Sequence, residues 1–134
     1  MASIFVEIPI DASPDDAWAA LRDWGALHEL APGFVLETKV DGEDRLVTFF
    51  TGRQVRERII AVDDERRRLA WTLVDGPYAH YNGAAQVTER DGGGTLFGWT
   101  ADLLPHEGAE QTRELMERGA EAIKGALEAS RAAA

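Results

Sequence analysis

The first candidate for chemistry in this sequence is Glu57, an acid within an apolar strand pattern. Over residues 54–62, Val55, Glu57 and Ile59 share one face of the expected strand. Because side chains alternate across a strand, Glu57 faces inward if Val55 and Ile59 do. A carboxylate among apolar side chains is costly unless it is paired or protonated. Glu57 is therefore a candidate to hydrogen-bond a ligand, directly or through water.

Two other interpretations of Glu57 stay open. Its carboxylate can be satisfied inside the protein by Arg45 or Tyr81, or the strand can twist so that Glu57 reaches solvent. Tyr81 is itself a candidate, because its hydroxyl can donate to a ligand carbonyl or pair with Glu57. A buried tyrosine whose hydroxyl is satisfied by the protein is the more common case.

The remaining reactive residue types form no catalytic or metal-binding pattern. The chain has no cysteine, which excludes a disulfide, a thiolate zinc site and a cysteine nucleophile. Its three histidines, at 28, 80 and 106, lack the short spacing of metal ligands. The serines lie near the ends of the chain or at a helix start, which argues against a serine triad. We therefore predict no metal and no other cofactor.

Composition limits the partners and the setting. The 134 residues include 14 basic and 24 acidic side chains, a net charge of −10 at pH 7. The length fits a single domain over residues 1–134. An acidic surface repels duplex nucleic acid and anionic membranes, so neither is expected as a partner. We expect no signal peptide and no membrane insertion, and the lack of cysteine fits a cytoplasmic protein.

Apolar periodicity predicts the elements that position these side chains. Alternation predicts a strand over residues 3–10, and Ser13 and Pro14 mark the start of a helix that ends at Trp24. A second short helix is expected over about residues 25–30. Six further strands are predicted near residues 34–40, 45–51, 54–62, 67–74, 80–88 and 94–103. After Pro105, apolar residues recur every three or four positions, which predicts a long helix over about residues 107–130.

This order of elements predicts an α+β fold. Consecutive strands joined by short turns form an antiparallel sheet, and a long amphipathic helix can bury its apolar stripe only against one face of that sheet. We expect a curved seven-stranded antiparallel sheet wrapped around the C-terminal helix, with two short helices between the first two strands. A space that the side chains do not fill then becomes a cavity between sheet and helix.

Alternation also predicts which side chains line that cavity. Gly83 and Ala85 share the inward face with Tyr81, and small residues there leave room. Trp24 lies near the expected mouth, and the helix residues Met116 and Ala120 face the sheet, although such residues are more often plain core. The complete expected lining is Trp24, Phe49, Glu57, Trp71, Tyr81, Trp99, Met116 and Ala120.

Several motifs resemble the SRPBCC superfamily, also called START-like, Bet v 1-like or polyketide cyclase/dehydrase. The segment Glu57-Arg58-Ile59, followed by VDDERR at residues 62–67, resembles a strand–turn–strand signature of this family. Trp99-Thr100 and Pro105 resemble the end of its last strand. The resemblance covers about residues 3–130, and it implies a helix-grip fold with a hydrophobic pocket for a small molecule or lipid.

The resemblance bears on two site residues. In the plant abscisic-acid receptors of this superfamily, the glutamate that matches Glu57 lines the pocket, which supports a ligand role for Glu57. Alignment to the same receptors favours Gly98 and Thr100 as inward residues of the last strand, whereas apolar alternation favours Trp99. We follow the alternation.

Three functions are compatible with such a fold, because one fold hosts many functions. The first is binding of a small hydrophobic molecule or lipid, with Glu57 and Tyr81 as polar anchors. The second is a polyketide cyclase/aromatase-like enzyme in which these two residues supply proton transfer. The third is a protein-interaction module with a filled core. The sequence offers one buried acid and no second base, so we prefer binding, by a monomer or a homodimer.

Overall fold

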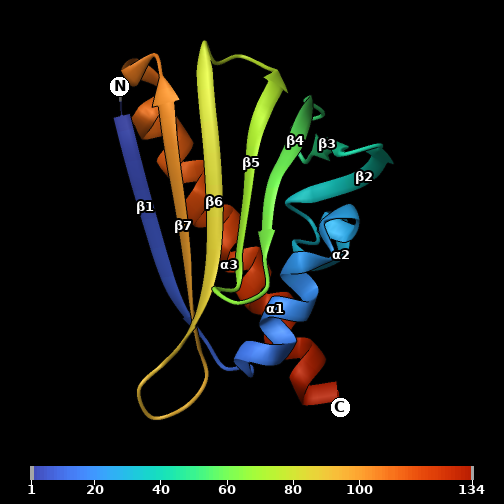
Figure 1. Ribbon diagram of the computed structural model, residues 1–134, viewed down its shortest axis with the longest axis vertical. Helices are drawn as coiled ribbons and strands as arrows, with labels where there is room; N and C mark the ends of the chain where they lie inside the picture. Colours follow the sequence, from blue (N-terminus) through green and yellow to red (C-terminus); the bar gives the residue numbers. More distant parts are fainter. Residues whose placement is uncertain (1, 134) are drawn as a thin grey trace.

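The computed structural model describes residues 2–133 and contains one seven-stranded antiparallel sheet (Figure 1). The strand order is β1-β7-β6-β5-β4-β3-β2, so each strand from β2 to β7 pairs with its neighbour in sequence and β1 closes onto β7. The strands are β1 (Ala2–Ile10), β2 (Val35–Asp41), β3 (Asp44–Phe49), β4 (Gln54–Asp63), β5 (Arg68–Asp75), β6 (His80–Glu89) and β7 (Thr95–Leu104).

Helices fill the two positions that the periodicity predicts. Between β1 and β2 lie α1 (Pro14–Arg22), the short 3-10 helix η1 (Trp24–Ala26) and α2 (Leu27–Leu30). After β7 come η2 (His106–Gly108) and the long helix α3 (Ala109–Ala133). The Ser13 hydroxyl accepts a hydrogen bond from the Asp16 backbone N–H at 3.0 Å, so Ser13 caps α1 as expected. The α+β helix-grip architecture predicted from the sequence is confirmed.

The helix α3 covers one face of the sheet, called here the inner face, and runs obliquely across the strands (Figure 1). Its buried stripe consists of Met116, Ala120, Ile123 and Leu127. Gly119 allows a close approach on the same side, since a Cβ there would lie 2.9 Å from ring atoms of Phe34 and Trp99. The helix α3 therefore packs closely against these two aromatic rings.

The strand boundaries differ from the predicted ones mainly at a turn. The strand expected over residues 45–51 ends at Phe49, because the chain reverses there: Gly52 N–H donates to the Phe49 carbonyl at 2.8 Å, with a positive φ of 87° at Gly52. The residues from Phe50 to Arg53 therefore form a β3–β4 turn rather than the end of a strand.

Within the described range, 2–133, no helix has the length and apolarity that crossing a membrane requires.

Candidate functional site

A cavity of about 390 Å³ lies between the inner face of the sheet and the first turns of α3. Its volume falls within the range of small-molecule sites. Aromatic and aliphatic side chains form most of its wall, and two turns, β3–β4 and β5–β6, contribute further residues to it. The lining residues are Phe34, Phe49, Phe50, Thr51, Arg53, Val55, Glu57, Leu73, Pro77, Tyr78, Tyr81, Trp99, Gln111, Thr112, Leu115 and Met116.

An ion pair lies on the inner face at this cavity. Arg45 on β3 and Glu57 on β4 are direct cross-strand neighbours, and Arg45 Nε donates to Glu57 Oε1 at 2.8 Å. Their side chains are only 3% and 9% exposed, respectively. Arg45 Nη1 also donates to the Trp24 carbonyl at 3.0 Å. Glu57 is thus paired inside the protein, and it lines the cavity as well; it does not turn to solvent.

Tyr81 on β6 lines the cavity near this pair. Burial raises the pKa of the Tyr81 phenol far above its usual value, and the negative charge of Glu57 and the presence of Tyr78 raise this pKa further. Trp99 and the Arg45 guanidinium oppose the rise only in part. The Tyr81 hydroxyl therefore keeps its proton at neutral pH and can donate a hydrogen bond.

An aromatic contact and a hydrogen bond connect lining residues of the cavity. The Phe34 ring meets the Phe49 ring edge-on, with centroids 5.5 Å apart. The hydroxyls of Tyr78 and Thr112 hydrogen-bond to each other, which ties the β5–β6 loop to α3. Each of these two contacts links segments that are separate in the sequence, so the wall of the cavity exists only in the folded chain.

A smaller void of about 50 Å³ adjoins the cavity deeper in the protein. Phe34, Phe49, Glu57 and Trp99 line both spaces, while Trp71 contacts only the deeper one of the two. The Arg45 guanidinium lies over the Trp71 ring, 5.4 Å from its centroid. Glu57 therefore lies where the two spaces meet, and its partner Arg45 lines the deeper one.

The structure brings together five of the eight residues predicted to line the site: Phe49, Glu57, Tyr81, Trp99 and Met116. Of the other three, Trp71 lines the deeper void. Trp24 and Ala120 line neither space: Trp24 contributes its carbonyl to Arg45, and Ala120 is 1% exposed in the packing of α3.

Sequence reasoning missed the parts of the wall that come from turns. Thr51 and Arg53 lie in the β3–β4 turn, and Pro77 and Tyr78 lie in the β5–β6 loop. Turns have no apolar period, so no signal in the sequence could assign them. Thr112 could have been predicted as a lining residue from the sequence, because it lies one helical turn before Met116 on the same face of α3.

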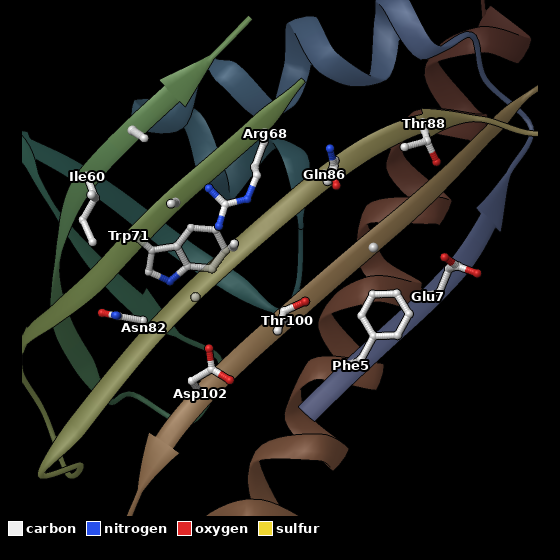
Figure 2. Close-up of a pocket in the computed structure, with 15 residues that line it drawn as sticks. Phe5, Glu7, Ile60, Arg68, Trp71, Asn82, Gln86, Thr88, Thr100 and Asp102 are labelled. Carbon is white, nitrogen blue, oxygen red and sulfur yellow. The ribbon is translucent and has the colours of Figure 1, made fainter. Parts of the chain in front are cut away.

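A second hollow, of about 430 Å³, lies on the outer face of the sheet (Figure 2). Polar side chains such as Asn82, Gln86 and Asp102 stand on its strands, and Phe5 is 55% exposed beside them. Gly98 and Thr100 line this hollow, so Trp99 between them faces inward, as the alternation predicts. Alternating polar residues are typical of a solvated sheet face, and we take the inner cavity as the candidate site.

Acidic residues and histidines do not gather into a metal site in the part of the chain that the structure describes: no three of them are placed to hold an ion.

Solved structures with the same fold come from several different organisms. XoxI from Bacillus cereus is 20% identical with a TM-score of 0.86, and the alignment covers 95% of this chain and 96% of that one. A protein from Nitrosospira multiformis is 18% identical with a TM-score of 0.83, covering 97% and 99%. Truncated norcoclaurine synthase from Thalictrum flavum is 21% identical with a TM-score of 0.70, covering 92% and 91%. At these identities the likeness shows the fold alone.

A comparison with curated proteins finds no match. A family model does match: it is described as polyketide cyclase / dehydrase and lipid transport, and it aligns with residues 1–133. That alignment leaves out only the last residue of the chain, so the whole fold described above falls within it. The chain therefore belongs to the polyketide cyclase/dehydrase and lipid transport family.

Proposed function

We propose that this protein binds a small, mainly apolar molecule or lipid in the cavity between the sheet and α3. The observation that carries the proposal is a cavity of about 390 Å³ with a largely apolar wall and a buried ion pair beside it. Apolar walls favour an apolar ligand, and a few convergent polar groups fix its orientation. Membership of a family whose description includes lipid transport supports the same class of function.

Glu57 and Tyr81 are the proposed polar anchors. Arg45 Nε occupies one position on Glu57 Oε1, and a carboxylate has about four acceptor positions in all. Glu57 can therefore accept a hydrogen bond from a ligand hydroxyl or N–H while it stays paired with Arg45. The Tyr81 hydroxyl, which remains protonated, can donate to the same ligand.

The same two residues argue for binding rather than for proton-transfer catalysis. A general base needs a pKa near the working pH, whereas the raised pKa of Tyr81 makes removal of its proton unfavourable. Glu57 shares its carboxylate with a guanidinium at 2.8 Å. A cyclase/aromatase-like reaction would need a further acid or base in the cavity, and among residues 2–133 its only charged lining residues are Arg53 and Glu57. The interaction-module alternative expects a filled core, which the cavity argues against.

Native mass spectrometry of the protein as purified tests the proposal. We expect a mass adduct that leaves on denaturation, and enhanced 1-anilinonaphthalene-8-sulfonate fluorescence in protein stripped of it. Leu115→Trp, which places an indole in the cavity, should abolish both signals. Ile60→Trp is the matched control, because Ile60 is 58% exposed on the outer face. Absence of both signals in the wild-type protein would contradict the proposal.

The role of Glu57 has a separate test. Glu57→Gln keeps the size of the side chain but removes its charge. We expect this variant to bind the released molecule more weakly, by roughly tenfold for one lost charge-assisted hydrogen bond. Unchanged affinity would show that Glu57 is not the anchor, and the cavity would then bind by its apolar wall alone.

A further inference from the structure

The opening of the cavity is marked by the lining residues that are also exposed to solvent. These are Thr51 and Arg53 in the β3–β4 turn, Pro77 in the β5–β6 loop and Gln111 on α3. Glu57, by contrast, is a buried part of the wall. A residue that borders both the cavity and solvent lies where the two meet. The mouth of the cavity therefore lies between these two turns and the start of α3.

The two charged lining residues differ in how they are compensated. Glu57 is the acid of the cavity wall within residues 2–133, and Arg45 Nε donates to it at 2.8 Å. Over the same residues seven arginines form ion pairs, and Arg53 is not among them. The hydrogen bonds of Arg53 there involve its backbone. Its guanidinium is thus free to turn toward an anion at the mouth.

A second guanidinium lies beside the same turn. The Arg118 Cζ atom is 4.3 Å from the centroid of the Phe50 ring, and Phe50 lines the cavity. Glu114 and Glu121 lie three or four residues from Arg118 along α3, yet within residues 2–133 Arg118 forms no ion pair with either of them. The cation–π contact holds the charge near the Phe50 ring instead. Arg118 therefore adds positive potential at the turn that also carries Arg53.

The net charge of the chain makes this positive mouth informative. Acidic side chains outnumber basic ones by 24 to 14, so most of the surface repels an anion. A guanidinium binds carboxylate and phosphate oxygens through its N–H groups, and such charge-assisted hydrogen bonds are stronger than neutral ones. An anionic group on a ligand thus finds its complement at the mouth, while its apolar part finds one in the cavity.

We propose that the cavity selects an acidic amphiphile, whose apolar body lies inside and whose anionic oxygen group binds Arg53 at the mouth. This inference rests on the proposed function and deepens it, because it adds the charge of the ligand and its direction in the cavity. Arg118 strengthens the attraction through its potential. Carboxylate and phosphate offer the same chemistry to a guanidinium, and the second experiment separates them.

The first experiment compares two dyes that differ in charge. 1-Anilinonaphthalene-8-sulfonate carries a sulfonate, N-phenyl-1-naphthylamine is the same molecule without it, and both gain fluorescence in an apolar site. We expect Arg53→Gln to weaken binding of the sulfonate dye by about fivefold and to leave the neutral dye unchanged. Arg118→Gln should weaken the sulfonate dye by about twofold. Arg90→Gln is the matched control, since the exposed β6–β7 turn lies at the other end of β6 from the β5–β6 loop (Figure 1).

Salt provides a readout that a merely structural role of Arg53 would not move. Raising the ionic strength from about 0.01 M to about 1 M shortens the screening length from about 30 Å to about 3 Å. We expect the difference in sulfonate-dye affinity between the wild type and Arg53→Gln to shrink over this range. Affinity for the neutral dye should not fall as salt is added.

The dye results distinguish failure of this inference from failure of the proposed function. Equal weakening of both dyes by Arg53→Gln would overturn the recognition of an anion, and so would an effect of Arg90→Gln on the sulfonate dye as large as that of Arg53→Gln. In both cases the cavity would still bind apolar molecules. If neither dye binds the wild type, or if Leu115→Trp leaves both bound, the proposed function fails and this inference with it.

The second experiment identifies the anion by displacement of the neutral dye. Dodecanoate, dodecyl phosphate and dodecan-1-ol share one alkyl chain and are compared below their micelle-forming concentrations. We expect Arg53→Gln to weaken displacement by at least one of the two anions by about fivefold, and displacement by the alcohol not at all. The anion that is affected more gives the class of headgroup. Equal losses for all three molecules, or no loss for either anion, would contradict the proposal.

Discussion

Arg45 and Glu57 stand directly opposite each other on β3 and β4, and Arg45 Nε donates to Glu57 Oε1 at 2.8 Å. With both side chains under 10% exposed, water solvates neither charge well. Each charge is therefore compensated mainly by the other. The ion pair also holds the Glu57 carboxylate in a fixed position at the wall of an otherwise largely apolar cavity.

Breaking this pair from the arginine side should be costly. Arg45→Met leaves the Glu57 carboxylate buried without compensation, and we expect a loss of about 3–5 kcal/mol in the free energy of unfolding, measured with urea. Arg131→Met is the control, since its ion pair with Asp11 is exposed and should change stability by less than about 1 kcal/mol. Equal losses of unfolding free energy in the two variants would show that the buried Glu57 carboxylate does not need Arg45 to compensate its charge.

Stability should fall in acid through Asp44. The Arg58 side chain, followed by Arg56, holds the pKa of the Asp44 carboxyl below its usual value by hydrogen bonds. A lowered folded-state pKa stabilises the protein above the unfolded value of about 3.9, and this contribution is lost as pH falls through the folded value. When the free energy of unfolding is measured with urea at a series of acid pH values, it should therefore depend less steeply on pH in Asp44→Asn than in the wild type. Asp91→Asn, in the exposed β6–β7 turn, is the control, and it should show the same pH dependence as the wild type.

Alkaline pH should act through Tyr81. Its phenol pKa is raised by burial and then by Glu57, so the unfolded state releases this proton at a lower pH than the folded state does. The contribution of Tyr81 to the free energy of unfolding is therefore fully present below about pH 10, and it is lost as pH rises beyond that value. Absorbance near 295 nm should show one of the two tyrosines ionising only on unfolding. Ionisation of both in the folded protein near pH 10 would contradict the burial of Tyr81.

Two glycines of α3 should respond in opposite ways to alanine. At Gly119 the new Cβ would lie 2.9 Å from Phe34 and Trp99 ring atoms, and we expect destabilisation by about 1–3 kcal/mol and weaker ligand binding. At Gly125 nothing lies within 4 Å, so alanine should stabilise the helix by about 0.5–1 kcal/mol. Thermal unfolding measures both. Stabilisation by Gly119→Ala would show that α3 does not approach the rings this closely.

The apolar pattern of the sequence by itself determined the elements and their order. Alternation marked the strands and put Trp99 and Tyr81 on the inner face, and the period of three to four residues marked α3 with Met116 on its buried stripe. These assignments succeed because the direction of a side chain within one element follows from the local geometry of the backbone.

Tertiary structure decided which of these residues meet. Arg45 reaches Glu57 because the β3–β4 register sets them opposite each other, and register is a relation between two strands. Alternation gave no means of choosing between Arg45 and Tyr81 as the partner of Glu57. The contribution of the turns to the cavity wall, and the placement of Trp24 and Ala120 outside it, depend likewise on how separate segments pack. Local pattern determines which way a side chain points, and only the packing of the whole chain determines what it contacts.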